Sequence, residues 1–564
     1  MFRIGIFFGG PAREREISFL GGKTTFTCLD RSLFTPVPVF IDGRGNFILL
    51  KPEFMEAQSI RDFYPPPAFT ATEGYPFRVY EESLDLDPES ERAMIQAVGT
   101  QVEPKDFAAH FDFAFLAVHG PQLEDGAIQG LLEWYGIPYY GSGLMGSGIG
   151  IDKIAQNILI QRTVGLNKRL YSITKEQWDH TDKSILFELV KEHVGLPFVC
   201  KAPHQGSSIG VSFVRKDELD EFVKGVLQSF FLQRITREEW VSLTDNEKGE
   251  KLQRIANLDE GIAFPLVLDE KEIITHPAVL WKALDATFTA GAEFALLSSV
   301  HAEDAVLFES FVNGQEFSCG VIQDFDGSPL ALPPSEVIKL DDNTVFDFKT
   351  KYLTSTTRKA IPIRTSLENN RKVHAIVKET FDLFKFGACV RIDGFLTPEG
   401  EVLLHDPNTL PGMSPSSFIF KQMAEIGLNV TDSLTYFIRF SLRERIRTGK
   451  FTSMLRMELK KLDDAIRARV AGLASRTRTE IRFPATDEAF EEAKKTYNRV
   501  AASADQVPVP VLLHPEKGAV ILNAALMARP SVAELIESLD QPVHPLIEEC
   551  RAHSRAVREF LTAS

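Results

Sequence analysis

Two short apolar runs, each followed by glycine, dominate the hydrophobic pattern near the start of the chain. The first is Ile-Gly-Ile-Phe-Phe-Gly-Gly at 4–10, and the second covers 113–118 and is followed by His-Gly at 119–120. Continuous runs of this length are typical of strands that are buried on both faces of a parallel sheet. The pattern therefore predicts two central strands, each followed by a turn.

A helical pattern follows the second of these runs. Apolar residues recur at helical spacing between 128 and 135, and Gly-Ile-Pro at 136–138 ends the pattern. Strands and helices that alternate in this way indicate an open α/β domain over roughly 1–150.

Two further blocks are rich in strand-forming residues, one at 196–214 and one at 306–404. The segment between them, about 216–305, has mixed patterning and is interpreted as an insertion. After about residue 443 the pattern becomes mainly helical. Val-Pro-Val-Pro at 507–510 is interpreted as a linker or an edge strand, because proline cannot donate to a sheet ladder.

The composition excludes several classes of protein. A chain of 564 residues is too long for one core and suggests about three to five units. Its 44% hydrophobic and 25% charged residues fit a folded protein, and its net charge of −16 argues against nucleic-acid binding. No apolar run approaches the roughly 18 residues of a membrane span, and no signal peptide is indicated, so a cytoplasmic location is expected.

The five cysteines are far apart and form no C-x-x-C pair, so we expect neither a zinc site nor a disulfide framework. They are interpreted as buried apolar side chains.

A loop rich in glycine and serine is the first candidate for chemistry. Lys201 ends an apolar run, and Gln-Gly-Ser-Ser-Ile-Gly follows at 205–210. Small residues let backbone N–H groups approach phosphate oxygens, and a nearby lysine adds positive charge. A tight hairpin without a ligand is the alternative.

A polar hairpin carries the stronger signal. Arg391 and Asp393 share one face of a strand, as do Asp406 and Asn408 on the next one. A four-residue loop at 398–401 would place Asp393 opposite Asp406, whereas a three-residue loop would shift the register by one. Two facing carboxylates and an amide oxygen suit Mg²⁺ that bridges nucleotide phosphates. A solvated surface hairpin is the alternative.

Two glutamates, Glu309 and Glu316, bracket a short polar segment after another apolar run. A carboxylate at a strand end can accept hydrogen bonds from ribose hydroxyls, although either glutamate alone could also be surface charge.

In their order along the chain these motifs resemble the D-alanine–D-alanine ligases of the ATP-grasp superfamily. The resemblance covers roughly 1–215 and 301–440. The segments that carry it are 7–10, 14–18, 119–130, 140–143, 152–153, 201–210, 309–317, 351–353, 391–393 and 408–413.

The resemblance implies a role for each matching residue. Those implied for ATP are Lys153, Lys201, Gly206, Ser207, Ser208, Glu309, Glu316 and Lys351. Those implied for two Mg²⁺ ions, with Mn²⁺ as an alternative, are Asp393, Asp406 and Asn408. Those implied for the amino-acid substrates are Glu16, His119, Lys351, Arg391 and Ser417.

Catalytic roles are implied for Arg391 and the Gly412 backbone, which would stabilise an oxyanion. Glu16, Ser207 and Tyr352 would form a hydrogen-bonded set that closes a loop over the site and excludes water. Asp406 stands where the family usually has glutamate, and Phe418 where leucine is common. The ring of Phe418 is larger than a leucine side chain and favours a small second substrate such as alanine or glycine.

The resemblance implies an ATP-grasp fold, of the α/β class, with an N-terminal open α/β domain, an insertion and a mainly helical extension. The expected parts are a substrate domain (1–150), a central ATP-grasp subdomain (151–215), the insertion (216–305), a catalytic subdomain (306–445) and the extension (446–564).

The implied function is ATP-dependent formation of D-alanyl-D-alanine for peptidoglycan through an acyl phosphate. One alternative is a ligase for other amino acids in a specialised pathway, and another is a non-catalytic binding protein. The expected partners are small-molecule amino-acid substrates, and binding to nucleic acid or to a membrane is not expected. Whether the chain forms a homodimer is left open. A Rossmann dehydrogenase is disfavoured because Gly-Gly-Pro at 9–11 lacks the G-x-G-x-x-G spacing.

Overall fold

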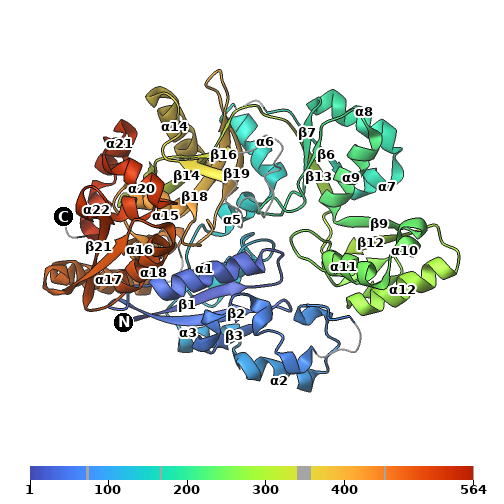
Figure 1. Ribbon diagram of the computed structural model, residues 1–564, viewed down its shortest axis with the longest axis horizontal. Coiled ribbons are helices and arrows are strands. Elements are labelled where there is room, and N and C mark those ends of the chain that lie inside the picture. Colours follow the sequence, from blue (N-terminus) through green and yellow to red (C-terminus); the bar gives the residue numbers. More distant parts are fainter. Residues whose placement is uncertain (71–74, 166–167, 340–356, 450–451, 563–564) are drawn as a thin grey trace.

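The computed structural model describes residues 1–70, 75–165, 168–339, 357–449 and 452–562. The described strands form five sheets, and helices cover them (Figure 1). The sheet of β9 to β12 (232–299) is inserted in the sequence between two strands, β8 (Ser212–Val214) and β13 (Ala305–Ser310), of another sheet. This mixed α/β architecture confirms the expected fold class. No described helix is long and apolar enough to cross a bilayer. All five cysteines are buried and free, as the sequence analysis expected.

The N-terminal domain is built on a five-stranded sheet in the order β4-β3-β2-β1-β5. Strands β1, β2 and β5 are parallel, and the predicted apolar runs form β1 and β5. The strands are β1 (Phe2–Gly9), β2 (Phe34–Ile41), β3 (Phe47–Leu50), β4 (Gly99–Gln101) and β5 (Phe113–Leu116). The helices are α1 (Arg15–Cys28), α2 (Pro88–Val98), α3 (Phe107–His110) and α4 (Ala127–Trp134). Short 3-10 turns are η1 (Pro52–Glu56), η2 (Ile60–Asp62), η3 (Pro67–Phe69), η4 (Glu81–Ser83) and η5 (Pro104–Asp106).

Helix α1 is fixed against the carboxyl ends of two strands by one serine. The Ser18 hydroxyl accepts from the Gly9 N–H at 2.8 Å and donates to the Ala117 carbonyl at 2.7 Å. The first turn of α1 therefore starts at the edge of the sheet where β1 and β5 end.

The central subdomain is an antiparallel sheet in the order β6-β13-β7-β8. Its strands are β6 (Leu170–Thr174), β7 (Phe198–Lys201), β8 (Ser212–Val214) and β13 (Ala305–Ser310). Its helices are α5 (Leu144–Ile151), α6 (Lys153–Thr163), α7 (Lys175–His180), α8 (Lys183–Val194) and α9 (Leu219–Phe230). Phe222 and Phe230 of α9 share a core with Phe198 and Phe308 of the sheet. Helix α9, which lies inside the predicted insertion, thus belongs to this layer.

The rest of the predicted insertion forms a unit of its own around the antiparallel sheet β11-β10-β12-β9. Its strands are β9 (Leu232–Thr236), β10 (Leu266–Leu268), β11 (Glu272–Ile274) and β12 (Phe294–Ser299). Its helices are α10 (Arg237–Ser242), α11 (Asp245–Ile255) and α12 (Pro277–Thr289). Phe77 and Val79 of the N-terminal domain share the core of this unit, so the insertion contacts that domain directly.

The part of the chain predicted to be the catalytic subdomain contains the sheet β17-β16-β14-β18-β19, with β15 paired to β14. Its strands are β14 (Gln315–Gln323), β15 (Pro329–Ala331), β16 (Ser335–Lys339), β17 (Thr357–Ala360), β18 (Cys389–Leu396) and β19 (Val402–Asn408). The helices next to it are α14 (Leu367–Leu383), α15 (Phe418–Glu425) and α16 (Val430–Thr448).

The β18–β19 hairpin has the register that the four-residue-loop alternative predicted. Asp393 lies opposite Asp406, and Arg391 opposite Asn408. Next to the turn, Leu396 pairs with Val402, so the register there is shifted by one residue from the predicted one. A bulge between Asp393 and Gly394 takes up this extra residue and restores the predicted register at Asp393.

The C-terminal extension contains a three-stranded sheet as well as helices. Its strands are β20 (Thr477–Pro484), β21 (Gln506–His514) and β22 (Gly518–Ile521). Its helices are α17 (Thr452–Gly472), η6 (Leu473–Ser475), α18 (Asp487–Ala501), α19 (Ala524–Met527), α20 (Val532–Leu539), α21 (Pro545–His553) and α22 (Arg555–Leu561). The Val-Pro segment at 507–510 lies in β21, which is the middle strand of the order β20-β21-β22, so both the linker and the edge-strand interpretations are wrong. The prolines are tolerated because only residues 511–514 of β21 pair with β22.

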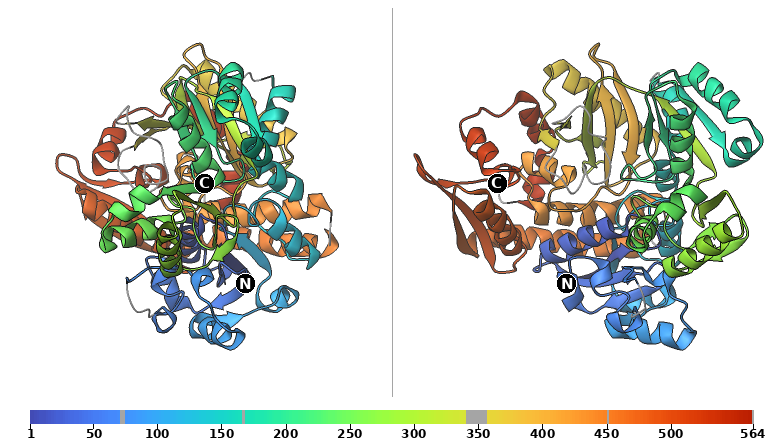
Figure 2. Two further views of the ribbon diagram at one scale, coloured as in Figure 1. Left: turned by 90° about the vertical axis from the view of Figure 1, so that its right-hand side faces the viewer. Right: turned by 45° about the vertical axis from the view of Figure 1, so that its right-hand side comes forward.

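One buried arginine joins the extension to two other parts of the chain. Arg469 of α17 pairs with Asp30 at 2.6 Å and with Asp432 at 2.9 Å, and it donates to the Leu561 carbonyl at 2.7 Å. All three charged side chains are buried. In Figures 1 and 2 the extension and the insertion lie at opposite sides of the molecule, and the N-terminal domain lies between them.

Candidate functional site

Loops from three parts of the chain meet around one small cavity. The N-terminal domain contributes the loops after β1 and β5, the central subdomain contributes the glycine loop after β7, and the catalytic subdomain contributes the ends of β18 and β19. The residues around it are Glu14, Ile17, His119, Glu124, Gly206, Ser207, Arg391, Asn408, Leu410 and Gly412. Six of these were predicted site residues that are distant in sequence.

Of the two glutamates near the start of α1, Glu14 lines this cavity and the predicted Glu16 does not. The Ser207 hydroxyl donates to Glu14 Oε1, and Glu14 is only 4% exposed. A Cβ on Gly206 would lie 2.5 Å from Glu14 Oε2, so any other residue there would displace this carboxylate. Burial and the nearby Glu124 raise the pKa of Glu14. Oε2 of Glu14 has no hydrogen-bond partner among the described residues.

The structure places Glu16 on another face of α1. Its carboxylate accepts from the Ser59 hydroxyl at 3.0 Å, the Ile60 N–H at 3.0 Å and the Tyr80 hydroxyl at 2.8 Å. The physical reason is helical geometry, because α1 begins at Arg15 and two residues turn the chain by about 200°. The predicted hydrogen-bonded set therefore contains Ser207 with Glu14. Its other predicted member, Tyr352, lies outside the described residues, as does Lys351.

His119 lies beside Glu14 and is held by a second carboxylate. Its Nδ1 is 3.8 Å from Glu124 Oε2, while Glu124 Oε1 accepts from the Gly120 N–H at 3.0 Å. Burial opposes protonation of His119, but Glu124 more than offsets it, and the pKa of His119 is raised. Its Nε2 lacks a partner among the described residues, so the cavity contains a second unsatisfied polar atom.

The glycine loop has a strained backbone where it approaches this cavity. Ser207 and Ser208 both have positive φ, at 51° and 62°. Such values are uncommon for residues other than glycine and cluster at functional sites. The base of the loop is held by Lys153, whose ammonium donates to the Gln205 carbonyl at 2.6 Å.

The polar hairpin brings its oxygen atoms together at the edge of the same cavity. Asp393 accepts from the Ser318 hydroxyl at 2.7 Å and from Arg391 at 3.0 and 2.9 Å. Asp406 Oδ1 is 3.5 Å from the Lys153 ammonium. Opposed carboxylates beside an amide side chain form a donor set of hard oxygens, which fits Mg²⁺.

A second polar cluster lies behind the hairpin around Glu309. Its carboxylate pairs with Lys201 at 2.6 Å and with Lys168 at 3.0 Å. Burial would raise the pKa of Glu309, but the two lysines more than offset it, and its pKa is lowered. Burial lowers the pKa of Lys168 to about 8. The sequence analysis missed Lys168, because a single lysine in a polar segment gives no signal of burial.

Two more predicted residues lie in different surroundings. Glu316 is half-buried on β14, opposite Phe395 of β18. Ser417 precedes α15, and its hydroxyl is buried without a hydrogen-bond partner among the described residues. The neighbouring Phe418 ring lies 5.8 Å from the Arg391 guanidinium, so the start of α15 reaches the cavity.

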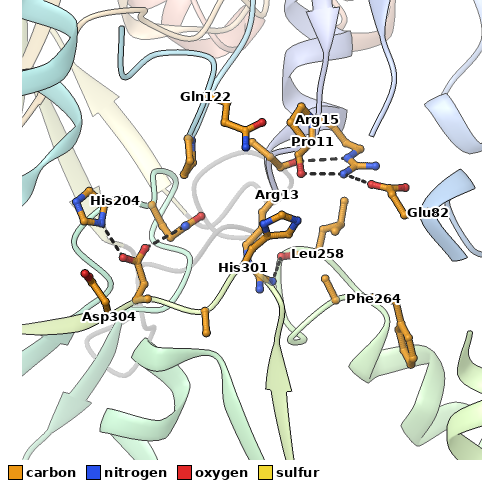
Figure 3. Close-up of a pocket in the computed structure, with 16 residues that line it drawn as sticks. Pro11, Arg13, Arg15, Glu82, Gln122, His204, Leu258, Phe264, His301 and Asp304 are labelled. Atoms are coloured by element: carbon orange, nitrogen blue, oxygen red, sulfur yellow. Dashed lines mark hydrogen bonds and ion pairs between the residues drawn. The ribbon is translucent and has the colours of Figure 1, made fainter. Parts of the chain in front are cut away.

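A larger cavity of about 460 Å³ lies on the other side of the glycine-loop base (Figure 3). His204 and Asp304 line one side of it, and the ion pair of Arg15 with Glu82 lines the other. Arg13 reaches across to the insertion, where it donates to the Leu258, Gly261 and Ile262 carbonyls. This cavity therefore lies between the N-terminal domain, the glycine loop and the insertion, and residues of all three line it.

His204 should make stability depend on pH, and His204→Gln should remove that dependence. The hydrogen bond with Glu303 raises the pKa of His204 above 6.5. Because the folded pKa exceeds the unfolded one, the pair stabilises fully below about pH 6.5 and this stabilisation is lost as pH rises through the folded pKa. The His204 side chain is 37% exposed, so the effect is below about 1 kcal/mol.

Urea unfolding at about pH 6 and about pH 9 measures this difference. A substitution of His301 is the matched control. Burial lowers the pKa of His301, so its contribution to stability increases with pH, opposite to that of His204. An unchanged pH dependence in His204→Gln would contradict the assignment.

Comparison with known proteins gives one consistent family. A sequence model described as "D-ala D-ala ligase N-terminus" matches residues 3–142, and one described as "D-ala D-ala ligase C-terminus" matches 159–249 and 289–439. The gap between the last two ranges lies inside the predicted insertion.

Curated relatives carry the corresponding name. The D-alanine–D-alanine ligase of Streptomyces avermitilis is 25% identical over 445 residues, which are 78% of this chain and 94% of that protein. D-alanine–D-alanine ligase A of Escherichia coli K12 is 27% identical over 442 residues, 78% of this chain and 95% of that protein. The solved D-alanine–D-alanine ligase of Coxiella burnetii superposes with a TM-score of 0.50 at 18% identity, over 81% of this chain and all of that one.

Proposed function

Because the chain belongs to the D-alanine–D-alanine ligase family of ATP-dependent, C–N bond-forming ligases, we propose that it joins two D-alanine molecules for peptidoglycan synthesis. The first carboxylate attacks the γ-phosphate of ATP and gives an acyl phosphate and ADP. The amine of the second amino acid then attacks the acyl carbon, loses a proton and expels phosphate.

The observation that supports this proposal best is the cavity around Glu14. It combines a carboxylate, an imidazole and a guanidinium, from Glu14, His119 and Arg391, with the backbone of Gly412. Unsatisfied atoms of Glu14 and His119 point to a polar ligand there, because buried polar groups normally have partners. We propose that Glu14 binds the ammonium group of the first amino acid.

Arg391 and the Gly412 N–H are proposed to stabilise the oxyanion that forms when the amine attacks, because preorganised donors act most strongly on developing charge. The unpartnered hydroxyl of Ser417 is proposed to bind the carboxylate of the second amino acid. Phe418 limits the space beside it, which favours a small side chain.

Asp393, Asp406 and Asn408 are proposed to hold two Mg²⁺ ions, with Mn²⁺ as an alternative. When bound, such ions would neutralise charge on the phosphates of ATP. Lys153, Lys201 and the backbone at Gly206, Ser207 and Ser208 are proposed to contact the phosphates. Glu309 and Glu316 are proposed to lie near the adenine and the ribose.

A substrate panel tests the function. We expect D-alanine alone to release phosphate from ATP and to give a dipeptide by mass spectrometry, with little D-alanyl-D-lactate when D-lactate is added. Changing one methylene in the second pocket should alter selectivity by about 1–3 kcal/mol, so larger amino acids should react more slowly. A dominant depsipeptide or a preference for a bulky second residue would point to the specialised-ligase alternative.

A cytoplasmic location, where ATP is available, is part of the proposal. We expect the chain to act alone or as a homodimer, and its mass from light scattering distinguishes the two.

A further inference from the structure

A third cavity, of about 330 Å³, lies between the sheet of β14 to β19 with its helices and the C-terminal extension. One wall is formed by α15 and the start of α16, and the other by α18 and α19. Figure 1 shows α15, α16 and α18 next to one another. Helix α15 also contacts α19, so both walls lie against each other. This cavity is separate from the one around Glu14, with which it shares no lining residue.

The walls of this extension cavity are largely apolar, and its charged groups are mostly cations. Phe420, Ala424 and Met527 supply buried apolar surface. The charged residues that line it are Lys421, Glu491, Lys494, Lys495 and Arg529, which are four cations and one carboxylate. This local excess is opposite in sign to the net charge of −16 of the whole chain. An anion with an apolar body would match both properties.

Among the described residues, one of these cations makes no direct ion pair, and Glu534 and Glu491 attract it only weakly. Lys494 pairs with Glu491 at 2.6 Å, and Arg529 pairs with Glu425 at 2.5 Å. The half-buried ammonium of Lys421 has no hydrogen bond or ion pair among the described residues. Burial and Lys494 lower the pKa of Lys421 to about 8. A bound anion would supply the missing counter-charge.

The cavity is coupled to the proposed active site through α15. Ser416, which lines the cavity, is next to Ser417, and the Lys421 N–H donates to the Ser417 carbonyl at 3.3 Å. Gln422 donates to the Ser318 carbonyl at 2.7 Å, and the Ser318 hydroxyl donates to Asp393. A displacement of α15 would therefore reach both the start of the helix and the metal-site candidate.

We propose that the extension cavity binds a small amphipathic anion, an apolar body with a phosphate or carboxylate group, and that its occupancy alters the binding of the second amino acid. The first part stands independently of the ligase activity. The second part rests on the proposed function, since it concerns Ser417 and its substrate.

Calorimetric titration of the full chain tests the binding. The nucleotide site is first filled with a non-hydrolysable ATP analogue and Mg²⁺, so that the probe cannot bind there. Phenyl phosphate and benzoate distinguish the two anionic groups, while phenol and inorganic phosphate test the apolar and charged halves separately. We expect one of the amphipathic anions to bind with a Kd near or below about 1 mM and both halves to bind more weakly.

Two variants locate the binding. Lys421→Met should weaken it at least about tenfold, because the unpaired cation is lost. Ala528→Phe should do the same by filling the cavity, without removing a charge. Lys460→Met, at an exposed position of α17, is the matched control and should bind normally. Thermal midpoints confirm that each variant is folded. Equal binding by all three variants, or no binding by either amphipathic anion, would overturn the site.

Steady-state kinetics tests the coupling. The bound probe should change the KM for the second D-alanine at least about twofold in the unmodified chain and not in Ala528→Phe. A probe that binds in the cavity but leaves this KM unchanged would overturn the coupling alone. Absence of ligase activity together with normal probe binding would instead count against the proposed function.

Discussion

Asp393→Asn is expected to lower kcat by about 10²- to 10³-fold while the fold persists, because the charge that develops on the transferred phosphoryl group loses one of its stabilising ligands. Asp393 lies opposite Asp406 and accepts from both Ser318 and Arg391. The substitution keeps the shape and the acceptor for Ser318 but removes the negative charge. Phosphate release at saturating ATP, Mg²⁺ and D-alanine measures the effect.

The control for this variant is a second Asp–Arg pair, in which the arginine is buried and the aspartate is partly buried. Asp463 binds Arg439 through two hydrogen bonds of 2.9 and 2.8 Å, a geometry close to that of Asp393 with Arg391. Asp463→Asn should therefore reproduce the cost in stability without the loss in kcat. Near-normal kcat of Asp393→Asn at saturating Mg²⁺ would remove Asp393 from the metal site. Asn408→Ala should behave like Asp393→Asn.

Glu14→Gln and Glu16→Gln should differ strongly, although they alter residues two apart. A hydrogen bond to a charged group contributes about 1.5–3 kcal/mol, so loss of the Glu14 charge should lower kcat/KM for D-alanine by roughly 10- to 150-fold. Glu16→Gln affects contacts outside the cavity, with Ser59, Ile60 and Tyr80 and, at 3.9 Å, with Arg61. Its kcat/KM should stay within about twofold of the unmodified value.

Initial rates at varied D-alanine and saturating ATP give both ratios, and urea unfolding corrects for folded fraction. The two variants serve as controls for each other, because each removes one charge from the same short segment. The opposite ranking would restore Glu16 as the substrate residue and displace Glu14.

The sequence predicted the hairpin better than it predicted the glutamate, and the reason is geometric. Side chains alternate strictly along a strand, so the spacing of Arg391 and Asp393 specifies one face whatever surrounds them. The cross-strand register was also correct, although a bulge rather than the loop length produced it. Glu14 and Glu16 lie where a loop becomes a helix, and the resemblance that implied Glu16 does not say which of the two side chains faces the cavity, because that depends on where the helix begins.

The features that the sequence did not predict depend on contacts between segments that are distant in the chain. Lys168 is buried only because β13 places Glu309 beside it. The assignment of α9 to the central sheet rests on its aromatic contacts with Phe198 and Phe308, which no local pattern reveals. The five cysteines and the first strands were predicted correctly, because burial of short apolar runs is a local property.

The buried arginine of α17 bears on how this chain can be divided. Asp30 belongs to the N-terminal domain and Asp432 to the stretch that the family shares, yet both are neutralised by Arg469, which lies beyond the end of the matched region at residue 439. A gene trimmed to the family boundary would cut α16 (Val430–Thr448) in two, remove the cation that both carboxylates share, and expose to water the surfaces that the extension covers. The ligase portion and its extension are therefore expected to fold stably only when they are expressed together as one chain.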